Sequence, residues 1–172
     1  ADAIQAAEDM LAEGAAADAA ETFAAILEEE PDNAKAYGGL VRSHLAIGNL
    51  EQAEGLLNAA PEKIARSQEV ETARAQLGLA RQAANAGPLD QLQAKVAADP
   101  ADMQARFDLA LAQHAAGQVE AAIDTLLDIM RRDRDWNEGA AKAQLLTIFE
   151  ALKPNDPVVL KGRRKLASIL LS

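Results

Sequence analysis

The sequence contains no cysteine among its 172 residues, and only 3% of them are aromatic. The lack of cysteine excludes disulfides, thiolate metal sites and cysteine chemistry within this chain, and it fits a cytoplasmic location. No apolar run approaches the roughly 18 residues that a membrane-spanning helix needs. A core with so few rings must consist of Ala, Leu, Ile and Val, and Ala is the best helix former.

Positive charge is also missing from residues 1–34, which contain ten acidic residues and no Lys or Arg. Residues 131–172 contain nine basic and five acidic residues, within a chain of net charge −10. The acidic start disfavours nucleic acid and anionic membranes as partners. It is either a charge pattern that steers a partner or neighbouring domain or simply a solvated helix face.

A glycine recurs between two apolar helical patterns. Gly14 and Gly48 lie 34 positions apart, and Gly117 follows after about two further periods. Glycine accepts the left-handed backbone that ends a helix, and a 34-residue period of this kind is typical of tetratricopeptide repeats. The sequence therefore predicts an all-α tetratricopeptide-repeat α-solenoid of about ten helices, with a degenerate middle repeat and an atypical C-terminal helix pair.

We expect a single domain over residues 1–172. Its expected parts are repeats at about 1–33 and 34–60, a degenerate repeat at 61–100, a repeat at 101–134 and capping helices over 135–172. An atypical end is expected because a solenoid must be closed against water at its terminus.

Several side chains are suited to begin helices. Expected N-caps are Asp32 or Asn33, then Ser67, and finally Asp156, which precedes Pro157. Pro88 suits the first position of another helix, and Asp135 with Glu138 has the spacing of a capping box. Trp136, at the start of that helix, is expected to pack as a structural plug rather than to bind a partner.

The sequence offers little support for catalysis. His44 and His114 have no second His, Cys or paired carboxylate at ligand spacing, so each is expected to pack or to line a groove. A glycine-rich phosphate loop after a strand is not expected, since no strands are predicted. We therefore expect no enzyme activity, no catalytic or metal-binding residue and no cofactor.

The first helix of each repeat is expected to line a concave face that contacts partner proteins. Gly38 is expected to point toward this face. The candidate partner-binding residues on it are Arg42, Leu45, Phe107, Leu111 and His114. Only Arg42 fits the basic pattern with which one subclass clamps the acidic C-terminus of a chaperone, so that clamp is not predicted.

Two basic clusters occur late in the chain. The arginines of residues 131–134 lie near a helix end, where positive charge complements the helix dipole. Residues 163–165 lie in the last helix, before an apolar end. That helix is either a handle for the groove of another protein or a closure of the core by Ile169 and Leu170, with the basic residues in water.

Residues 134–172 resemble the end of a known bacterial family in the order and spacing of their motifs. The motifs are Arg134-Asp135-Trp136-Asn137, Ala143-Gln144-Leu145-Leu146, Phe149-Glu150-Ala151-Leu152, Asn155-Asp156-Pro157 and Arg163-Arg164-Lys165-Leu166-Ala167-Ser168. Members of this family join an N-terminal thioredoxin-like domain to a C-terminal tetratricopeptide region, and they are called chaperedoxins or YbbN-type co-chaperones.

The resemblance implies a cytoplasmic role in protein quality control, in which unfolded clients are held and passed to the chaperonin or other general chaperones. It also implies a thioredoxin-like domain upstream of Ala1, where the chain starts within a helical pattern. Chaperonin contact by the final helix points to Arg163, Arg164, Leu166, Ile169, Leu170 and Leu171. No nucleic acid or membrane partner is expected. The alternative is a generic tetratricopeptide adaptor in another bacterial assembly, such as an envelope or secretion complex.

Overall fold

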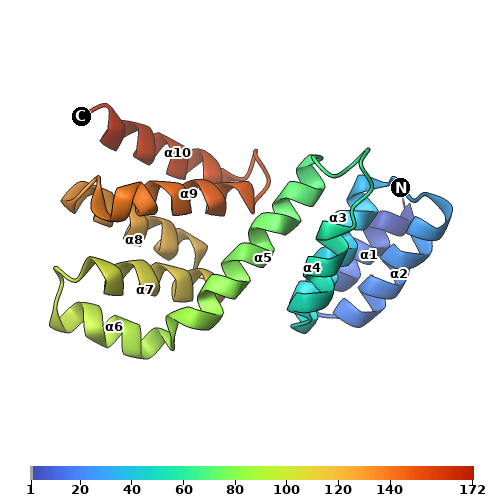
Figure 1. Cartoon of the computed structure of the whole chain (residues 1–172), viewed down its shortest axis with the longest axis horizontal. Coiled ribbons are helices and arrows are strands. Elements are labelled where there is room, and N and C mark those ends of the chain that lie inside the picture. The colour runs from blue at the N-terminus through green and yellow to red at the C-terminus, as the bar shows by residue number, and fades with distance from the viewer. Residues whose placement is uncertain (1) are drawn as a thin grey trace. The chain divides into compact units, whose positions relative to one another are not determined.

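The computed structural model describes residues 2–172 and is built from helices (Figure 1). Ten α-helices and one short 3₁₀ helix follow one another in this described part, which contains no strand. The predicted all-α class is therefore confirmed. The contacts divide the chain into two compact units, which meet between Gly78 and Leu79. The repeat boundaries proposed above, and the single domain over residues 1–172, stay predictions.

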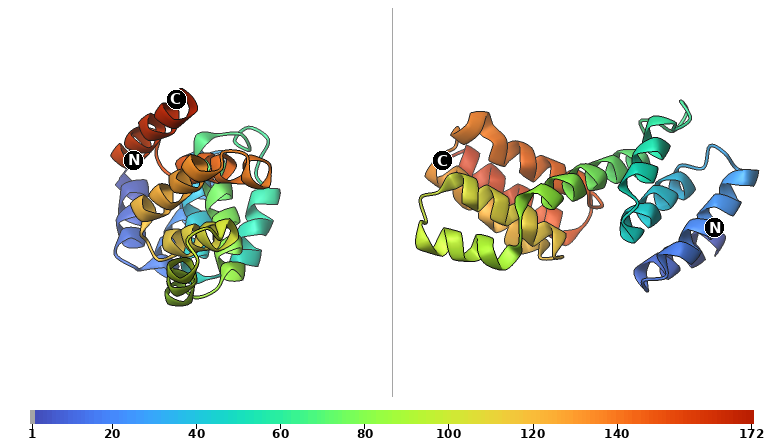
Figure 2. Two further views of the ribbon diagram at one scale, coloured as in Figure 1. Left: turned by 90° about the vertical axis from the view of Figure 1, so that its left-hand side faces the viewer. Right: turned by 60° about the horizontal axis from the view of Figure 1, so that its bottom comes forward.

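Unit 1, the part up to Gly78, contains four complete helices and the start of a fifth. Their bounds are α1 Asp2–Ala12, α2 Ala16–Glu29, α3 Ala34–Ile47, α4 Leu50–Asn58 and α5 Gln68–Ala86. Helices α1 and α2 pack together, as do α2 with α3 and α3 with α4 (Figure 2). The core of the unit is formed by their apolar sides, with Phe23, Val41 and Val70 completely buried.

Unit 2 begins at Leu79, within α5, and contains the remaining helices. Their bounds are α6 Leu89–Ala98, α7 Met103–Ala115, α8 Val119–Arg132, the 3₁₀ helix η1 Trp136–Gly139, α9 Ala140–Glu150 and α10 Pro157–Leu170. Helix α8 lies at the centre of the unit, because it contacts α7, α9 and α10. Its apolar side is buried along its whole length, and Leu126, Leu127 and Ile129 have no exposed surface.

The predicted glycine turns have the same backbone structure in both units. Gly14, Gly48 and Gly117 have φ values of +88°, +93° and +82°. After Gly14, the amide of Ala15 donates to the carbonyl of Met10 at 2.8 Å, and Gly14 itself donates to Leu11 at 3.2 Å. The corresponding pairs of hydrogen bonds occur at Gly48 and at Gly117. This is the Schellman arrangement, which satisfies helix-end carbonyls, so three helix pairs share one chain reversal.

Two helical glycines permit close packing within unit 1. A Cβ on Gly39 would lie 2.4 Å from two ring carbons of Phe23, and a Cβ on Gly38 would lie 2.8 Å from the carbonyl oxygen of Glu69. The prediction that Gly38 points toward an open concave face is therefore wrong. This glycine is buried where α3 meets the start of α5.

Three of the predicted N-caps are confirmed by side-chain hydrogen bonds. Asn33 accepts from the amide of Ala36 at 3.1 Å, and Asp156 accepts from Val158 at 2.9 Å. Ser67 directly precedes α5, and its Oγ accepts from the amide of Val70, in the first turn of that helix, at 3.3 Å. Local sequence thus determines where these helices begin.

Two other helix starts differ from their predictions. Pro88 has extended backbone (ψ 139°) and precedes α6 as its N-cap, so it is not the first helical residue. The capping box of Asp135 and Glu138 is wrong, since Asp135 makes no side-chain cap. Asn137, Glu138 and Gly139 all have positive φ instead, and α9 begins after this left-handed turn.

Candidate functional site

In unit 1, an ion pair joins α1 to α3, which are the first helices of two successive repeats. The guanidinium of Arg42 binds the carboxylate of Glu8 through both of its terminal nitrogens, with the Nη1–Oε2 distance at 3.2 Å. Both side chains are half-buried, and this bidentate geometry is the stronger form of such a pair. Arg42 is therefore balanced within the chain and is not a free cation. Sequence reasoning missed Glu8, although the 34-residue spacing between the two residues places them at equivalent positions of successive repeats.

The other candidate of unit 1, Leu45, packs against a buried cluster that includes Tyr37 and Val41. The Tyr37 hydroxyl donates to the carbonyl of Leu56, which links α3 to α4. Burial raises the pKa of Tyr37 above its ordinary value, so the phenol remains protonated at neutral pH. Leu45 thus contributes both to packing and, through its accessible part, to the surface of α3.

The candidates of unit 2 lie on α7. Phe107 packs against Trp136 with ring centroids 5.5 Å apart and ring planes inclined by 48°. Leu111 is buried, whereas His114 is half-buried. Desolvation lowers the pKa of His114 below its ordinary value, which keeps the imidazole neutral at pH 7. Phe107 and His114 are therefore the members of this group that keep accessible surface.

The final helix α10 divides its candidate residues between core and surface. Leu166 and Ile169 are buried in unit 2, and Leu170 is half-buried. Arg164 is exposed, and Leu171 is 87% exposed. The helix thus packs through one side and leaves a basic and apolar side accessible.

Arg163 is exposed but also contacts the core. Its guanidinium carbon lies 5.1 Å from the centroid of the Phe149 ring, within the range of a cation–π interaction. The same ring is close to Gly162, where a Cβ would lie 2.7 Å from it. These contacts hold α10 to the C-terminal part of α9.

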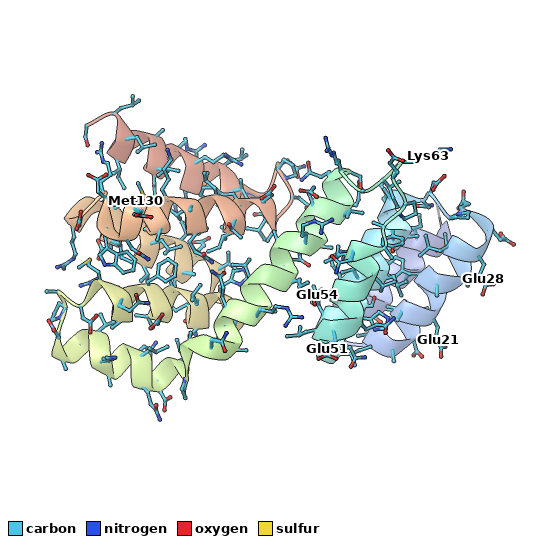
Figure 3. The ribbon with its side chains drawn as sticks, in the orientation of Figure 1. Glu21, Glu28, Glu51, Glu54, Lys63 and Met130 are labelled. Carbon is cyan, nitrogen blue, oxygen red and sulfur yellow. The ribbon has the colours of Figure 1, made fainter. Side chains whose placement is uncertain are left out.

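Acidic side chains cover the second helices of unit 1. Glu21 and Glu28 of α2 and Glu51 and Glu54 of α4 are exposed, and Glu21 and Glu28 lie on the outer side of α2 in Figure 3. Within residues 2–172, no group of three or more His, Asp or Glu side chains could hold a metal ion.

Comparisons with family models identify tetratricopeptide repeats in both units. Family models described as tetratricopeptide repeat match residues 10–77 and residues 82–171. An uncharacterized protein of Haemophilus influenzae is 34% identical over 128 residues, which cover 74% of this chain and 58% of that protein. The chain thus spans less than two thirds of the length of this relative. The family matches confirm the predicted tetratricopeptide-repeat α-solenoid class.

Among solved structures, the chain is similar to a domain of a Vibrio parahaemolyticus protein of unknown function. The identity is 24%, the TM-score is 0.46, and the match covers 97% of both chains. Within the described residues, no helix combines the length and the apolar character that crossing a membrane requires.

Proposed function

Because this chain belongs to the tetratricopeptide repeat family, we propose that it is the protein-binding module of a thioredoxin-like co-chaperone. Tetratricopeptide repeats are generally non-catalytic modules that bind other proteins, and their stacked helices offer extended surfaces for this purpose. The module binds unfolded client proteins and the chaperonin or another general chaperone in the cytoplasm. Its thioredoxin-like domain lies upstream of Ala1.

The observation that carries this proposal is an exposed stripe formed by Leu160 and Arg164 of α10 and by Leu171, the C-cap residue that directly follows the helix. Leu160 is 46% exposed and Leu171 is 87% exposed, and Arg164 between them is also exposed. Leu171 keeps a right-handed helical backbone and lies 11 positions after Leu160, which is about three turns, so the two leucines are on nearly the same side of the helix. An amphipathic helix that presents apolar side chains among charged ones commonly docks into the groove of another protein.

Packing of α10 supports the same role. Val159, Leu166 and Ile169 hold the opposite side of the helix in the core of unit 2. The stripe is thus presented on an ordered helix, which reduces the entropy lost when a partner binds. Deletion of residues 158–172 would remove the stripe but also the buried side of α10, so it would disturb the core of unit 2. Substitutions within the stripe are therefore the sharper test.

The test replaces both exposed leucines, as Leu160→Asp with Leu171→Asp. The matched control is Ile47→Asp with Leu146→Asp, because these two exposed side chains lie on α3 and α9. Chaperonin capture by the immobilised chain is measured by surface plasmon resonance, and client holding by light scattering from heated citrate synthase. We expect the α10 variant to lose about tenfold in chaperonin affinity and the control to keep it.

Equal capture by the wild-type chain and the α10 variant would refute the role of the stripe. Circular dichroism of both variants checks that the helices remain. The co-chaperone context has a separate test in the residues encoded before Ala1. A signal peptide there, or a fold other than thioredoxin, would contradict it.

A further inference from the structure

A cleft of about 410 Å³ lies between the C-terminal ends of α8 and α10. Its lining residues are Met130, Arg131, Arg134, Lys165, Ser168, Ile169 and Ser172. None of them belongs to α7 or α9, and none belongs to the Leu160–Arg164–Leu171 stripe. The volume is in the range of ordinary ligand sites, and the lining combines three cations with two hydroxyl groups over an apolar floor.

The cations of the cleft are only partly neutralised. Asp128 lies beside Arg131, but their closest atoms are 3.6 Å apart. The other oxygen of Asp128 binds Arg106 at 3.2 Å, and the Arg106 side chain is only 10% exposed. One carboxylate thus serves two guanidinium groups, and the buried one has the shorter contact. Arg131 is therefore only weakly paired with Asp128 and can bind another anion.

The other two cations also remain available. Lys165 pairs with Asp124 at 3.0 Å, but both side chains are accessible, and exposed pairs of this kind exchange readily with other ions. Arg134 donates one hydrogen bond to the carbonyl of Ile169, near the negative end of α10. A guanidinium has five N–H donors, so this bond leaves others for a ligand. With both aspartates and Arg106 included, the groups around the cleft carry a net formal charge of +2.

The packing of α8 against α10 brings these residues together. Arg131 lies in the last turn of α8 and Arg134 follows two residues after the end of that helix, whereas Lys165 and Ser168 lie in the C-terminal half of α10. Met130, labelled in Figure 3, and Ile169 are buried below them and form the apolar floor.

We propose that this cleft binds a short acidic peptide segment, with carboxylates on the three cations and an apolar side chain on the floor. The positive charge selects an anionic ligand, and arginine side chains suit the planar carboxylate. The chain as a whole has a net charge of −10, which repels long polyanions such as nucleic acid and anionic membranes at long range. A short segment that enters the cleft avoids most of that repulsion. The site is independent of the chaperone role proposed above.

The test uses fluorescence anisotropy with the full chain and a short labelled peptide of glutamates and leucines. We expect binding that weakens as salt rises and that is lost when glutamine replaces every glutamate in the peptide. Arg131→Gln with Lys165→Gln should lower the affinity about tenfold. The matched control is Lys142→Gln with Lys153→Gln, because these exposed lysines of unit 2 give the same charge change outside the cleft.

A second variant, Ser168→Glu, places a carboxylate at the cleft without removing any cation, and it should also abolish binding. Equal loss in the cleft variant and in the lysine control would overturn the proposal, as would tighter binding of a nucleic acid or an anionic vesicle. Tighter binding of the same peptide with phosphoserines in place of its glutamates would also overturn it. The proposal would also be overturned if the wild-type chain formed dimers and the cleft substitutions abolished them. The cleft would then bind the acidic first repeat of a second copy of the chain.

Discussion

Replacement of Gly39 by alanine should destabilise unit 1, although alanine is the better helix former. Gly39 lies within α3, and its missing side chain faces the ring of Phe23. A Cβ would lie 2.4 Å from two ring carbons, whereas unstrained carbon atoms lie about 3.5–4.0 Å apart. The overlap is thus more than about 1 Å, and either the ring or the helix must move.

The surroundings of Phe23 decide the magnitude. Phe23 is completely buried, and the residues Ala7, Ala19 and Ala36 around it are also completely buried. The ring cannot move toward solvent, so the overpacking penalty should be near the upper end of the usual range, about 3 kcal/mol. Alanine recovers about 1 kcal/mol through its helix propensity. We expect a net loss of about 2 kcal/mol in the free energy of unfolding.

Gly55 provides the matched control for this substitution. It also lies inside a helix of unit 1, and a Cβ there would meet nothing within 4 Å. Gly55→Ala should therefore raise the free energy of unfolding by up to about 1 kcal/mol. Urea denaturation followed by far-UV circular dichroism measures both changes. The fluorescence of Trp136, the only tryptophan, reports on unit 2 in the same samples.

A combination of substitutions identifies the clash itself. Phe23→Leu removes the part of the ring that meets the new methyl group, so Gly39→Ala should be far less harmful in that background. The expected interaction energy is about 1–3 kcal/mol. Equal effects of Gly39→Ala in both backgrounds, or a variant as stable as the Gly55→Ala control, would refute the reasoning.

Two further predictions concern charged groups. Burial holds the pKa of His114 in the folded state below that of the unfolded chain, so the unfolded state binds more protons and stability falls as the pH drops below about 6.5. His114→Gln should make the urea midpoint less dependent on pH between about pH 7 and about pH 5, and an unchanged dependence would contradict this assignment. For the half-buried pair of Glu8 and Arg42, a double-mutant cycle with glutamine at each position should give a coupling of about 0.2–1 kcal/mol. This coupling should shrink in high salt, and its absence at low salt would show that the bidentate contact does not stabilise unit 1.

The features that could be predicted from sequence are those that one residue type determines locally. Gly14, Gly48 and Gly117 were placed correctly because only glycine adopts positive φ without strain. Asn33 and Asp156 were placed correctly because a short polar side chain reaches the first free amides of a helix. The period of 34 residues between two of the glycines then indicated the fold class.

The features that were missed depend on contacts between helices. The local sequence cannot distinguish Gly39, which meets a ring, from Gly55, which meets open space. The spacing of Asp135 and Glu138 predicts a capping box, but Asn137 and Glu138 form a left-handed turn instead, which the residue spacing alone does not reveal. The two basic clusters meet at one cleft because α8 packs against α10, and no local pattern in the sequence indicates that contact.

The identical glycine turns also bear on how such a chain can change its length. Each reversal closes through hydrogen bonds between residues at fixed offsets from its glycine. If a whole 34-residue period is deleted or inserted between two of these glycines, the chain on either side joins in the same backbone conformation. The helices that follow then keep their apolar side toward the core. An insertion of a single residue would instead rotate everything beyond it by about 100° around the helix and turn the apolar side away from the core. Changes in the size of the binding surface are therefore restricted to steps of one helix pair.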